Sequence, residues 1–412
     1  MMTGETSFEE VVTQSRWATT VGKVCDQFGG EVQTGPFGSE LHASDYSDDG
    51  TPVVMPQDMR DGKIVCDRIA RVGPKHVSQL KRHILRAGDI VYSRRGDVTR
   101  FAVVTNAEEG WLCGTGSIRI RLNSPEIEVG YVRRYLQQEL VGKWLKHHAK
   151  GVTMPNLNTD VIRALPFVYP PLLEQRRIAQ VLDRAEALRA KRRAALAQLD
   201  LLRQSLFLDL FGDPATNSKG WPKQKLGDIA EKITDGEHQT PQRTTHGIKL
   251  LSARNVRDGF IDVADVDYVS PEEHERIKRR CHPELGDVLI SCSGTIGRVA
   301  TVSTSEPFSL VRSVALVKPK RGVIDSIFLE NYLRTPALRS RMQRSANASS
   351  QANLFQGQIR ELPTTLPPIE LQREFARRVT AVEALKTAQS ASLAELDALF
   401  ATLQHCAFRG EL

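Results

Sequence analysis

Two long stretches of the chain carry apolar side chains at spacings of three and four residues, which predicts amphipathic helices. Each follows a proline pair, at 170–171 or 367–368, and contains no further proline or glycine until Gly212 and Gly410. Proline suits the first turn of a helix, so each pair marks a helix start. The two apolar stripes comprise Ile178, Leu182, Ala185, Leu188, Ala195, Leu199, Leu202 and Leu206 in the first helix, and Phe375, Val379, Val382, Leu385, Ser392, Leu396, Leu399 and Leu403 in the second.

At 1.5 Å per residue, each of these helices would be roughly 60 Å long. A single apolar stripe must be buried against a partner. One arrangement packs each helix on its own globular domain, but a helix of this length exceeds such a domain. The favoured prediction is therefore that the two helices pair as an antiparallel coiled coil.

The helices are part of an internal repeat. After a shift of 197 residues, the segment 162–179 matches 359–376, and 196–206 matches 393–403. From Ile162 and Ile359 onward, roughly 20 of 50 aligned pairs are identical, and a period near 200 residues indicates duplication of a domain-sized unit. Upstream the match is weaker but persists, and a further shift of one residue aligns 88–104 with 286–302.

Upstream of each helix, short apolar runs are separated by Gly, Asp and Pro, which predicts short strands joined by turns. One helix is expected at about 128–148, with a counterpart at about 325–345. The predicted fold class is α+β, a tandem duplication of a β-rich α/β domain followed by a long helix. The predicted globular domains span 1–169 and 213–366, and the helical regions span 170–212 and 367–412.

Composition is that of an ordinary soluble globular chain, with 412 residues, 40% hydrophobic and 25% charged. No apolar run approaches the roughly 18 residues of a membrane helix, and no secretory signal precedes the first domain. The six cysteines form no C-x-x-C and no zinc spacing. We therefore expect a cytoplasmic protein with reduced thiols and no membrane partner.

Motifs for enzymatic chemistry are missing from the sequence. It contains no P-loop, no H-E-x-x-H, no strand-linked G-x-G-x-x-G and no N-P-P-[FY] tetrapeptide. Asp89 and Asp287 repeat between the halves, but each sits in a G-D-[IV] turn and is interpreted as structural. His147 and His148 have no second-half copy, which argues against a metal site. We therefore expect no catalytic residue, no metal and no cofactor in this chain.

Basic residues instead cluster in both halves, and the net charge is +7. Any single cluster is explained as well by a solvated charged surface. Clusters in both copies of a duplicated domain, in loops that also carry Asn, Gln and Ser, favour a nucleic-acid surface, because such side chains neutralise phosphates and bind base edges. The predicted DNA-binding residues are Gln57, Arg60, Arg94, Arg95, Arg100, Lys150 and Asn156 in the first half, and Arg254, Asn255, Arg257, Ser293, Thr295, Arg298, Arg312 and Asn353 in the second.

The chain resembles the specificity (S) subunit of type I restriction–modification systems over essentially its whole length. The resemblance depends on the two domain-plus-helix repeats, on L-P-x(3)-P-P at Leu165–Pro171 and Leu362–Pro368, on Phe211–Pro214, and on the C-terminal Phe408–Leu412. The second helix departs from the usual P-P-x-x-E-Q, because its glutamate is Glu370, two residues before Gln372.

The resemblance implies a non-catalytic subunit whose two target-recognition domains each read one half of a split, asymmetric site in double-stranded DNA. The antiparallel helices would set the spacing and bind two methyltransferase (modification) subunits, which bring S-adenosylmethionine. Restriction/translocase subunits would add ATP- and Mg²⁺-dependent translocation and cleavage. The residues assigned to subunit contacts are Gln175, Leu188, Leu199, Leu202, Leu206, Gln372, Leu385, Leu396, Leu399 and Leu403.

Three alternatives stay open at this point. The chain could serve a type IIB-like bipartite restriction–modification system, which changes its partners but not its role. A fused enzyme with nuclease activity would need a cofactor motif that the sequence lacks. A structural scaffold without a nucleic-acid role would not bind duplex DNA in a salt-sensitive manner.

Overall fold

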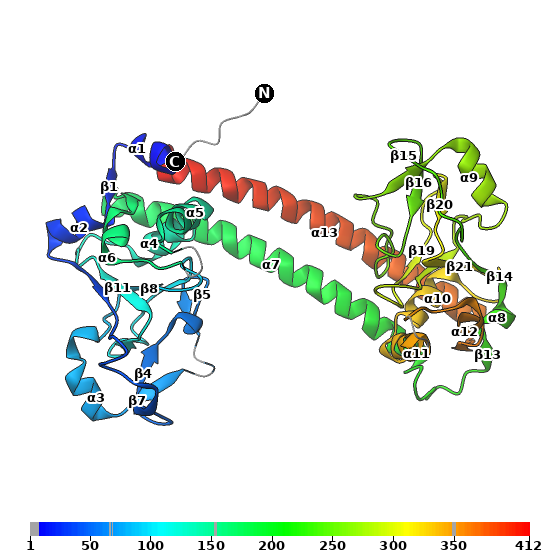
Figure 1. Cartoon of the computed structure of the whole chain (residues 1–412), viewed down its shortest axis with the longest axis horizontal. Coiled ribbons are helices and arrows are strands. Elements are labelled where there is room, and N and C mark those ends of the chain that lie inside the picture. The colour runs from blue at the N-terminus through cyan, green and yellow to red at the C-terminus, as the bar shows by residue number, and fades with distance from the viewer. Residues whose placement is uncertain (1–7, 66, 68, 152–154, 348–351) are drawn as a thin grey trace. The chain divides into compact units, whose positions relative to one another are not determined.

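A computed structural model describes residues 8–65, 67, 69–151, 155–347 and 352–412 of the chain. Its contacts divide the chain into two compact units. The first unit contains residues 1–192 and 392–412, and the second contains residues 193–391 (Figure 1). Each unit therefore combines one globular domain with one end of each long helix, and the first unit consists of two segments that are separate in the sequence.

The first unit is built on two four-stranded sheets. In the central sheet every neighbouring pair is antiparallel, and the order is β2 (Glu31–Thr34), β11 (Ser117–Arg121), β8 (Ile90–Ser93) and β9 (Phe101–Val103). The outer sheet has the order β10 (Leu112–Cys113), β4 (Thr51–Val54), β7 (Ala70–Val72) and β3 (Tyr46–Ser47). Two short antiparallel pairs complete the unit, β1 (Ala18–Thr20) with β12 (Pro166–Val168), and β5 (Met59–Arg60) with β6 (Lys63–Ile64).

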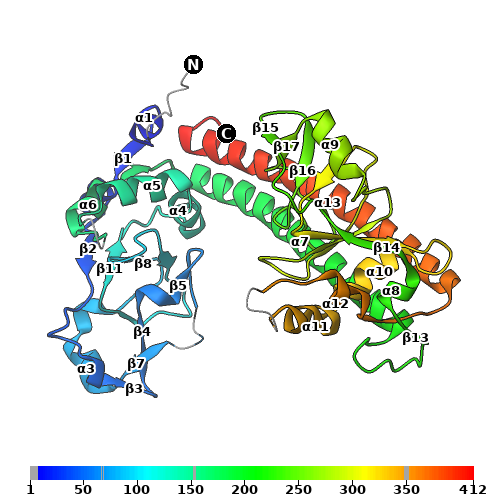
Figure 2. The same ribbon diagram turned by 45° about the vertical axis from the view of Figure 1, so that its right-hand side comes forward.

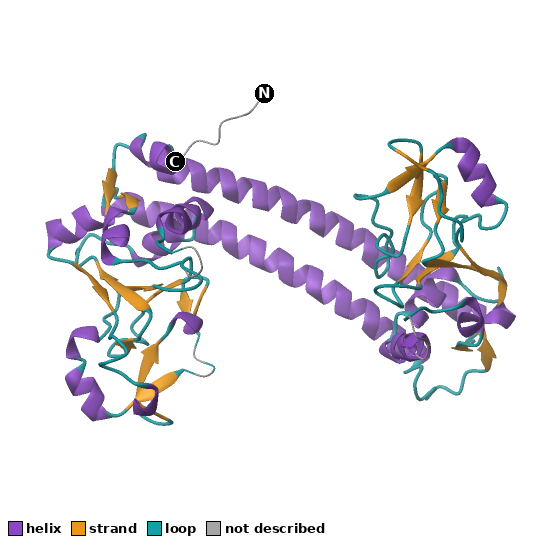
Figure 3. Ribbon diagram, in the orientation of Figure 1, coloured by secondary structure: helices purple, strands orange, loops and turns teal. Residues whose placement is uncertain are grey.

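The second unit repeats this plan. Its central antiparallel sheet has the order β14 (Ala230–Asp235), β21 (Val314–Pro319), β18 (Val288–Ser291) and β19 (Val299–Thr301). Its outer sheet has the order β15 (Arg243–Thr244), β17 (Asp267–Val269), β16 (Ile248–Leu251) and β20 (Phe308–Leu310), and β13 (Lys223–Lys225) pairs with β22 (Pro363–Thr365). Figure 3 shows the mixture of helix and sheet in both units, which confirms the α+β prediction and the tandem duplication.

Short helices cover the sheets. They are α1 (Phe8–Thr13), α2 (Val21–Phe28), α3 (Pro74–Gln79), α4 (Val129–Leu136), α5 (Glu139–His148) and α6 (Thr159–Ala164) in the first unit, and α8 (Leu226–Ile229), α9 (Pro271–Lys278), α10 (Ser326–Leu333), α11 (Pro336–Asn347) and α12 (Gln356–Arg360) in the second. The prediction of one helix near 128–148 and one near 325–345 is wrong in detail, because each is a helix pair. Gln138 is extended between α4 and α5. Pro336 begins α11, and the residue before a proline disfavours the helical conformation.

The long helices are continuous, α7 from Leu172 to Phe211 and α13 from Ile369 to Arg409. In each unit their segments lie side by side (Figures 1 and 2). In the first unit, Arg189 Nε donates to Asp397 Oδ1 at 2.6 Å. In the second, Lys386 Nζ donates to Asp200 Oδ1 at 2.7 Å. These pairs run antiparallel and are related by the 197-residue repeat, so the predicted antiparallel pairing is confirmed.

At two levels of α7, the residue that faces α13 is the one directly after the leucine of the predicted stripe. Leu182, Ala185, Leu199 and Leu206 face inward, but Leu188 and Leu202 are about half exposed. The inward positions at these levels belong to Arg189 and Arg203, whose guanidinium groups pair with carboxylates of α13.

Helix α13 shows the same change of phase. Leu396 and Leu403 are half-buried, whereas Leu385 and Leu399 are about half exposed. The inward neighbours of the exposed leucines are Lys386 and Phe400. Long cationic stems can cover apolar surface while their heads form ion pairs, which explains how the seam tolerates charged residues at these levels.

Glutamines at the helix entries are buried structural groups rather than subunit contacts. Gln175 Oε1 accepts from Glu128 N at 2.9 Å, and its amide nitrogen donates to the carbonyls of Glu126 and Pro170. Gln372 makes the equivalent bonds to Asp325 N, Val323 O and Pro367 O in the second unit. Both side chains are fully buried, so the prediction that Gln175 and Gln372 contact another subunit is wrong, because all their polar atoms fasten each helix to its own globular domain.

Each core is closed by the end of the helix that belongs to the other repeat. Phe408 of α13 packs edge-on against Tyr135 of the first unit, with ring centroids 5.0 Å apart. Phe211 of α7 packs edge-on against Phe328 of the second unit, at 4.7 Å. The repeated phenylalanine is therefore a core residue in both copies.

Candidate nucleic-acid interface

The central sheet of each unit has one edge where two strands end and a third begins. In the first unit, β2 and β8 end there and β11 starts. The loop after β8 carries Arg94–Arg100, and it is joined by main-chain bonds to the segment before α6. Leu157 N donates to Arg94 O at 2.9 Å, and Arg95 forms a bridge with Asn156. The predicted DNA-binding residues of this half lie in three loops, at 57–60, 94–100 and 150–158, and the structure brings the last two together.

The side chains at this edge differ in their exposure and in the bonds that they form within the protein. Arg94 is half-buried, donates from Nε to Asn156 Oδ1 at 3.3 Å, and lies 5.8 Å from the ring centre of Phe37. Arg95 is exposed, and its guanidinium has no bonded partner among the residues that the structure describes. Arg100 pairs with Asp97 at 3.3 Å, and Lys150 is exposed. Arg95 and Lys150 are therefore the cations most open to a ligand here.

The third predicted loop lies on the far strand of the same sheet. Gln57 and Arg60 are exposed, in and just after a short 3₁₀ turn, Pro56–Asp58. The hairpin β5–β6 that follows is held on β9 by the bond from Val103 N to Gly62 O, at 3.1 Å.

The second unit repeats the joined loops with different side chains. Ser293 forms a bridge with Asn353, and Leu354 N donates to Cys292 O at 2.9 Å. Thr295 is exposed at the loop tip, and its carbonyl accepts from Ser291 Oγ. The predicted cations of this surface are Arg298, which is half-buried, and Arg312, which is exposed. The same main-chain frame therefore presents arginines in one unit and small polar residues in the other.

One of the three DNA-binding residues predicted in the loop at 254–257 is not available to DNA. Asn255 is buried, its Oδ1 accepts from Ser252, and its amide donates to the carbonyls of Asp262 and Asp265. The assignment of Asn255 to DNA is therefore wrong, because its amide is used to shape the loop. Arg254 pairs with Asp265 and Asp267, and Arg257 with Asp262, each at 3.3–3.4 Å.

Two features of this edge were missed by sequence reasoning. Phe37 lies in a Gly-Pro-Phe-Gly turn after β2 and is 52% exposed. In the second unit, Asp235 at the end of β14 binds His238, Arg280 and Gln356. The Gly-Pro dipeptide indicates the first turn, but the second cluster joins three separate segments, at 235–238, 280 and 356, which no spacing in the sequence reveals.

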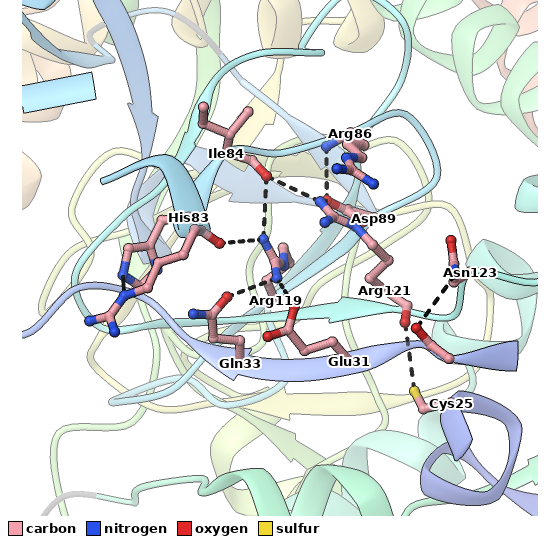
Figure 4. A network of polar contacts seen from close by, with 12 residues as sticks. Cys25, Glu31, Gln33, His83, Ile84, Arg86, Asp89, Arg119, Arg121 and Asn123 are labelled. Carbon is pink, nitrogen blue, oxygen red and sulfur yellow. Dashed lines mark hydrogen bonds and ion pairs between the residues drawn. The ribbon is translucent and has the colours of Figure 1, made fainter. Parts of the chain in front are cut away.

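Part of the basic run at 81–86 in the first unit takes part in contacts within the fold. Arg119 is buried and donates to the carbonyl of Arg82 at 2.7 Å and to Gln33 Oε1 at 2.8 Å (Figure 4). His83 is buried, and burial followed by the neighbouring Arg82 guanidinium lowers its pKa to about 4. Arg82 itself pairs with Glu40. At neutral pH, His83 is therefore uncharged and Arg82 is paired, whereas Lys81 and Arg86 are exposed.

The repeated aspartates are structural, as predicted. Asp89 is buried, accepts from Arg86 N at 2.8 Å and pairs with Arg121 (Figure 4). Asp287 is buried and pairs with Lys318 in the same way. Across the described ranges, no group of three or more His, Cys, Asp or Glu side chains is arranged to hold a metal ion. No helix within the described part of the chain is long and apolar enough to cross a membrane.

The model of the type I restriction modification DNA specificity domain matches the chain twice, over residues 38–198 and 218–397. The chain belongs to this family. One matched segment falls in each repeat, and each covers most of a globular domain and the first part of the following helix. The description of this chain as a type I specificity subunit is therefore confirmed.

Relatives and solved structures agree with the family. The chain is 24% identical to the type I restriction enzyme EcoBI specificity subunit of Escherichia coli, in an alignment that covers 68% of this chain. The same alignment covers 66% of the E. coli protein, just under two thirds of its length. It is 22% identical to the putative MjaX specificity subunit of Methanocaldococcus jannaschii over 82% and 81%. In fold it is similar to the type I S subunit from M. genitalium, with a TM-score of 0.57, 16% identity and 95% coverage of both chains.

A second solved chain comes from work on complex assembly and conformational transition of the type I R-M system. The fold similarity has a TM-score of 0.59 at 19% identity and covers 96% of this chain and 98% of that one. At these identities the similarity establishes the fold of the specificity subunit, with both domains and both helices.

Proposed function

We propose that this specificity subunit reads a bipartite, asymmetric sequence in double-stranded DNA, one half with each unit. The observation that carries the proposal is the repeated sheet edge, where the same pair of joined loops presents Arg94 and Arg95 in one unit and Ser293 and Thr295 in the other. A shared frame with different side chains suits two related readers of different base sequences.

The charge at these edges suits a duplex. Arg95, Lys150 and Arg312 are exposed cations. Arg298, in the second unit's counterpart of the loop that carries Arg95, is half-buried. Arginine and lysine contribute phosphate contacts, and exposed arginine also contributes bidentate contacts to guanine. Removing such a side chain should therefore weaken binding where it contacts a phosphate, and relax the base preference where it contacts guanine.

The helices are proposed to set the distance between the two half-sites. Support comes from their continuity over 40 and 41 residues and from their antiparallel ion pairs. A helix without a proline, glycine or break is a stiff element, so a fixed gap in the recognised sequence is the expected consequence.

We further propose that two modification subunits bind the outward leucines of α7 and α13. Leu188 and Leu385 are identical between the repeats and about half exposed, and so are Leu202 and Leu399. Because of the antiparallel pairing, the first unit carries Leu188 with Leu399 and the second carries Leu385 with Leu202. Two equal apolar pairs suit two copies of one partner, and those partners would supply S-adenosylmethionine-dependent methylation, while restriction subunits would supply the ATP- and Mg²⁺-dependent steps.

The proposal is tested by binding of the chain, assembled with its modification subunits, to duplex DNA at several salt concentrations. We expect a linear fall of log affinity with log salt, and competition by one bipartite sequence far stronger than by random duplex. Equal competition by every sequence would reject sequence recognition, and salt-independent binding would reject the phosphate contacts.

A further inference from the structure

From the geometry we propose that each unit presents one planar ring for stacking on a DNA base, Phe37 in the first unit and His238 in the second. The inference rests on the proposed DNA-binding function and adds a contact of a different kind. Aromatic rings that stack on bases hold or unstack a base step, and histidine as well as phenylalanine serves in this way.

The two rings occupy equivalent positions of the repeated fold, although the sequence repeat does not align them visibly. Gly35 follows β2 and donates its N–H to Ser117 O at 2.8 Å. Gly236 follows β14 and donates to Val314 O at 3.1 Å, and residues 117 and 314 are separated by the 197 residues of the repeat. Each ring lies two residues beyond its glycine.

Both glycines are required at these points, which fixes the start of each loop. A Cβ on Gly35 would come within 2.1 Å of Gly114 O, and one on Gly236 within 2.3 Å of Leu310 O. The chain therefore leaves each central sheet in close contact with the end of an outer-sheet strand, β10 in the first unit and β20 in the second. Such contact orients the two residues that follow.

The main chain of Phe37 is held firmly while its ring stays half in solvent. Phe37 N donates to Glu40 Oε2 at 3.0 Å, and its carbonyl accepts from Glu40 N at 2.8 Å and Leu41 N at 3.2 Å. The side chain is nevertheless 52% exposed. An isolated exposed apolar residue needs no explanation, but this one is fixed at the edge that carries Arg94, Arg95 and Lys150.

His238 is held by side-chain bonds and is 53% exposed. Its Nε2 lies 2.8 Å from Asp235 Oδ2 and 2.9 Å from a guanidinium nitrogen of Arg280. In the first unit, the guanidinium of Arg94 likewise approaches the ring of Phe37. Each unit therefore places a half-exposed ring beside an arginine, and a ligand with a flat π-face next to an anionic backbone matches that pair.

Nucleic acid fits these surroundings better than a protein partner does. An apolar protein pocket for Phe37 would also have to bury the guanidinium of Arg94, which lies 5.8 Å from the ring centre, and burying a charge without a charged partner is costly. A base step offers an apolar face for the ring and phosphates for the cations. The polar ring of His238 at the equivalent place agrees with a base and disagrees with an apolar pocket.

The test uses the full chain assembled with its modification subunits, and duplexes of its methylated sequence that carry 2-aminopurine at successive positions of either half-site. With the unchanged chain we expect one position in each half to gain fluorescence. Phe37→Ala should abolish the gain in the first half only, and His238→Ala in the second half only. Each should weaken binding roughly 10- to 100-fold, the range for loss of one base–aromatic stack.

Controls separate stacking from other roles. Phe37→Tyr and His238→Phe keep a ring and should keep most of the signal, whereas Phe37→Leu keeps apolar bulk without a ring and should lose it. Phe260 is another exposed phenylalanine, 58% exposed, and Phe260→Ala should leave the first half-site unchanged. Thermal melting of each variant reports whether it has folded.

The inference is overturned if folded Phe37→Ala and His238→Ala bind with unchanged affinity and fluorescence, or if Phe37→Leu behaves like the unchanged chain. Failure of the proposed function gives a different result, because the unchanged chain would then show no preference for any bipartite duplex. Sequence-specific binding that is indifferent to both rings rejects only the stacking contact.

Discussion

Replacing Gln175 or Gln372 by alanine tests how the globular domains are fastened to the helices. In Gln175→Ala, the buried carbonyl of Pro170 and the part-buried carbonyl of Glu126 lose their donor, and the part-buried amide of Glu128 loses its acceptor. A buried group left unsatisfied costs about 1–3 kcal/mol, and a part-buried hydrogen bond contributes about 1 kcal/mol. The expected loss is therefore about 4 kcal/mol of unfolding free energy for the first unit.

Gln372→Ala should cost slightly less in the second unit, because the bond to Val323 O is longer, at 3.3 Å. The assay is urea denaturation combined with hydrogen exchange. Gln175→Ala should accelerate exchange of the Glu128 amide without changing that of Asp325, and Gln372→Ala should do the reverse. Gln180, which is exposed on the same helix, supplies the control, and Gln180→Ala should stay within about 0.5 kcal/mol. A loss below about 1 kcal/mol with unchanged exchange would refute the reasoning.

Three further predictions concern the remaining claims. The pKa of His83 falls to about 4 in the folded chain, so its contribution to stability is complete above pH 6.5 and declines as pH falls toward 4. Between pH 7 and 5, the unfolding free energy of His83→Gln, measured by urea denaturation, should therefore fall by about 2 kcal/mol less than that of the unchanged chain. An identical fall would contradict the buried neutral imidazole. Arg95→Ala should relax base preference in one half-site and Arg298→Ala in the other, measured by competition binding, whereas effects on both halves from either change would disagree with separate readers. Duplicating Leu199–Leu202 after Leu202 adds about 6 Å to one helix and nearly keeps the phase of the seam. At about 3.4 Å per base pair, the gap in the methylated sequence should grow by one or two base pairs. An unchanged gap would contradict a helical spacer.

Much of the architecture was predictable because the repeat and the helix periodicity are strong, local signals. The ends of α7 and α13 followed from proline pairs and from the first glycine after each helix. The phase of the helix seam was less predictable, because apolar spacing alone favours Leu188 and Leu202, whereas the structure turns Arg189 and Arg203 inward. Ion pairs with α13 decide that choice, and they depend on the register between two helices far apart in sequence.

The candidate site was predictable only as far as the repeat aligned the loops. The alignment found the joined loops around Arg95 and Ser293 because both copies retain them. It did not reveal that Asn255 is buried, since an asparagine in a loop has the same sequence signal whether it shapes the loop or faces solvent. Phe37 and His238 were missed because their equivalence depends on strand ends and main-chain bonds, and the residues themselves differ.

The measurement that tests the central claim most directly is methylome sequencing of the host with and without this gene. Two different readers joined by stiff helices predict that adenine methylation dependent on the gene lies in one bipartite, asymmetric sequence with a gap of fixed length, and that the motif disappears when the gene is deleted. A continuous palindromic motif, a gap of variable length, or a motif that persists without the gene would contradict the account.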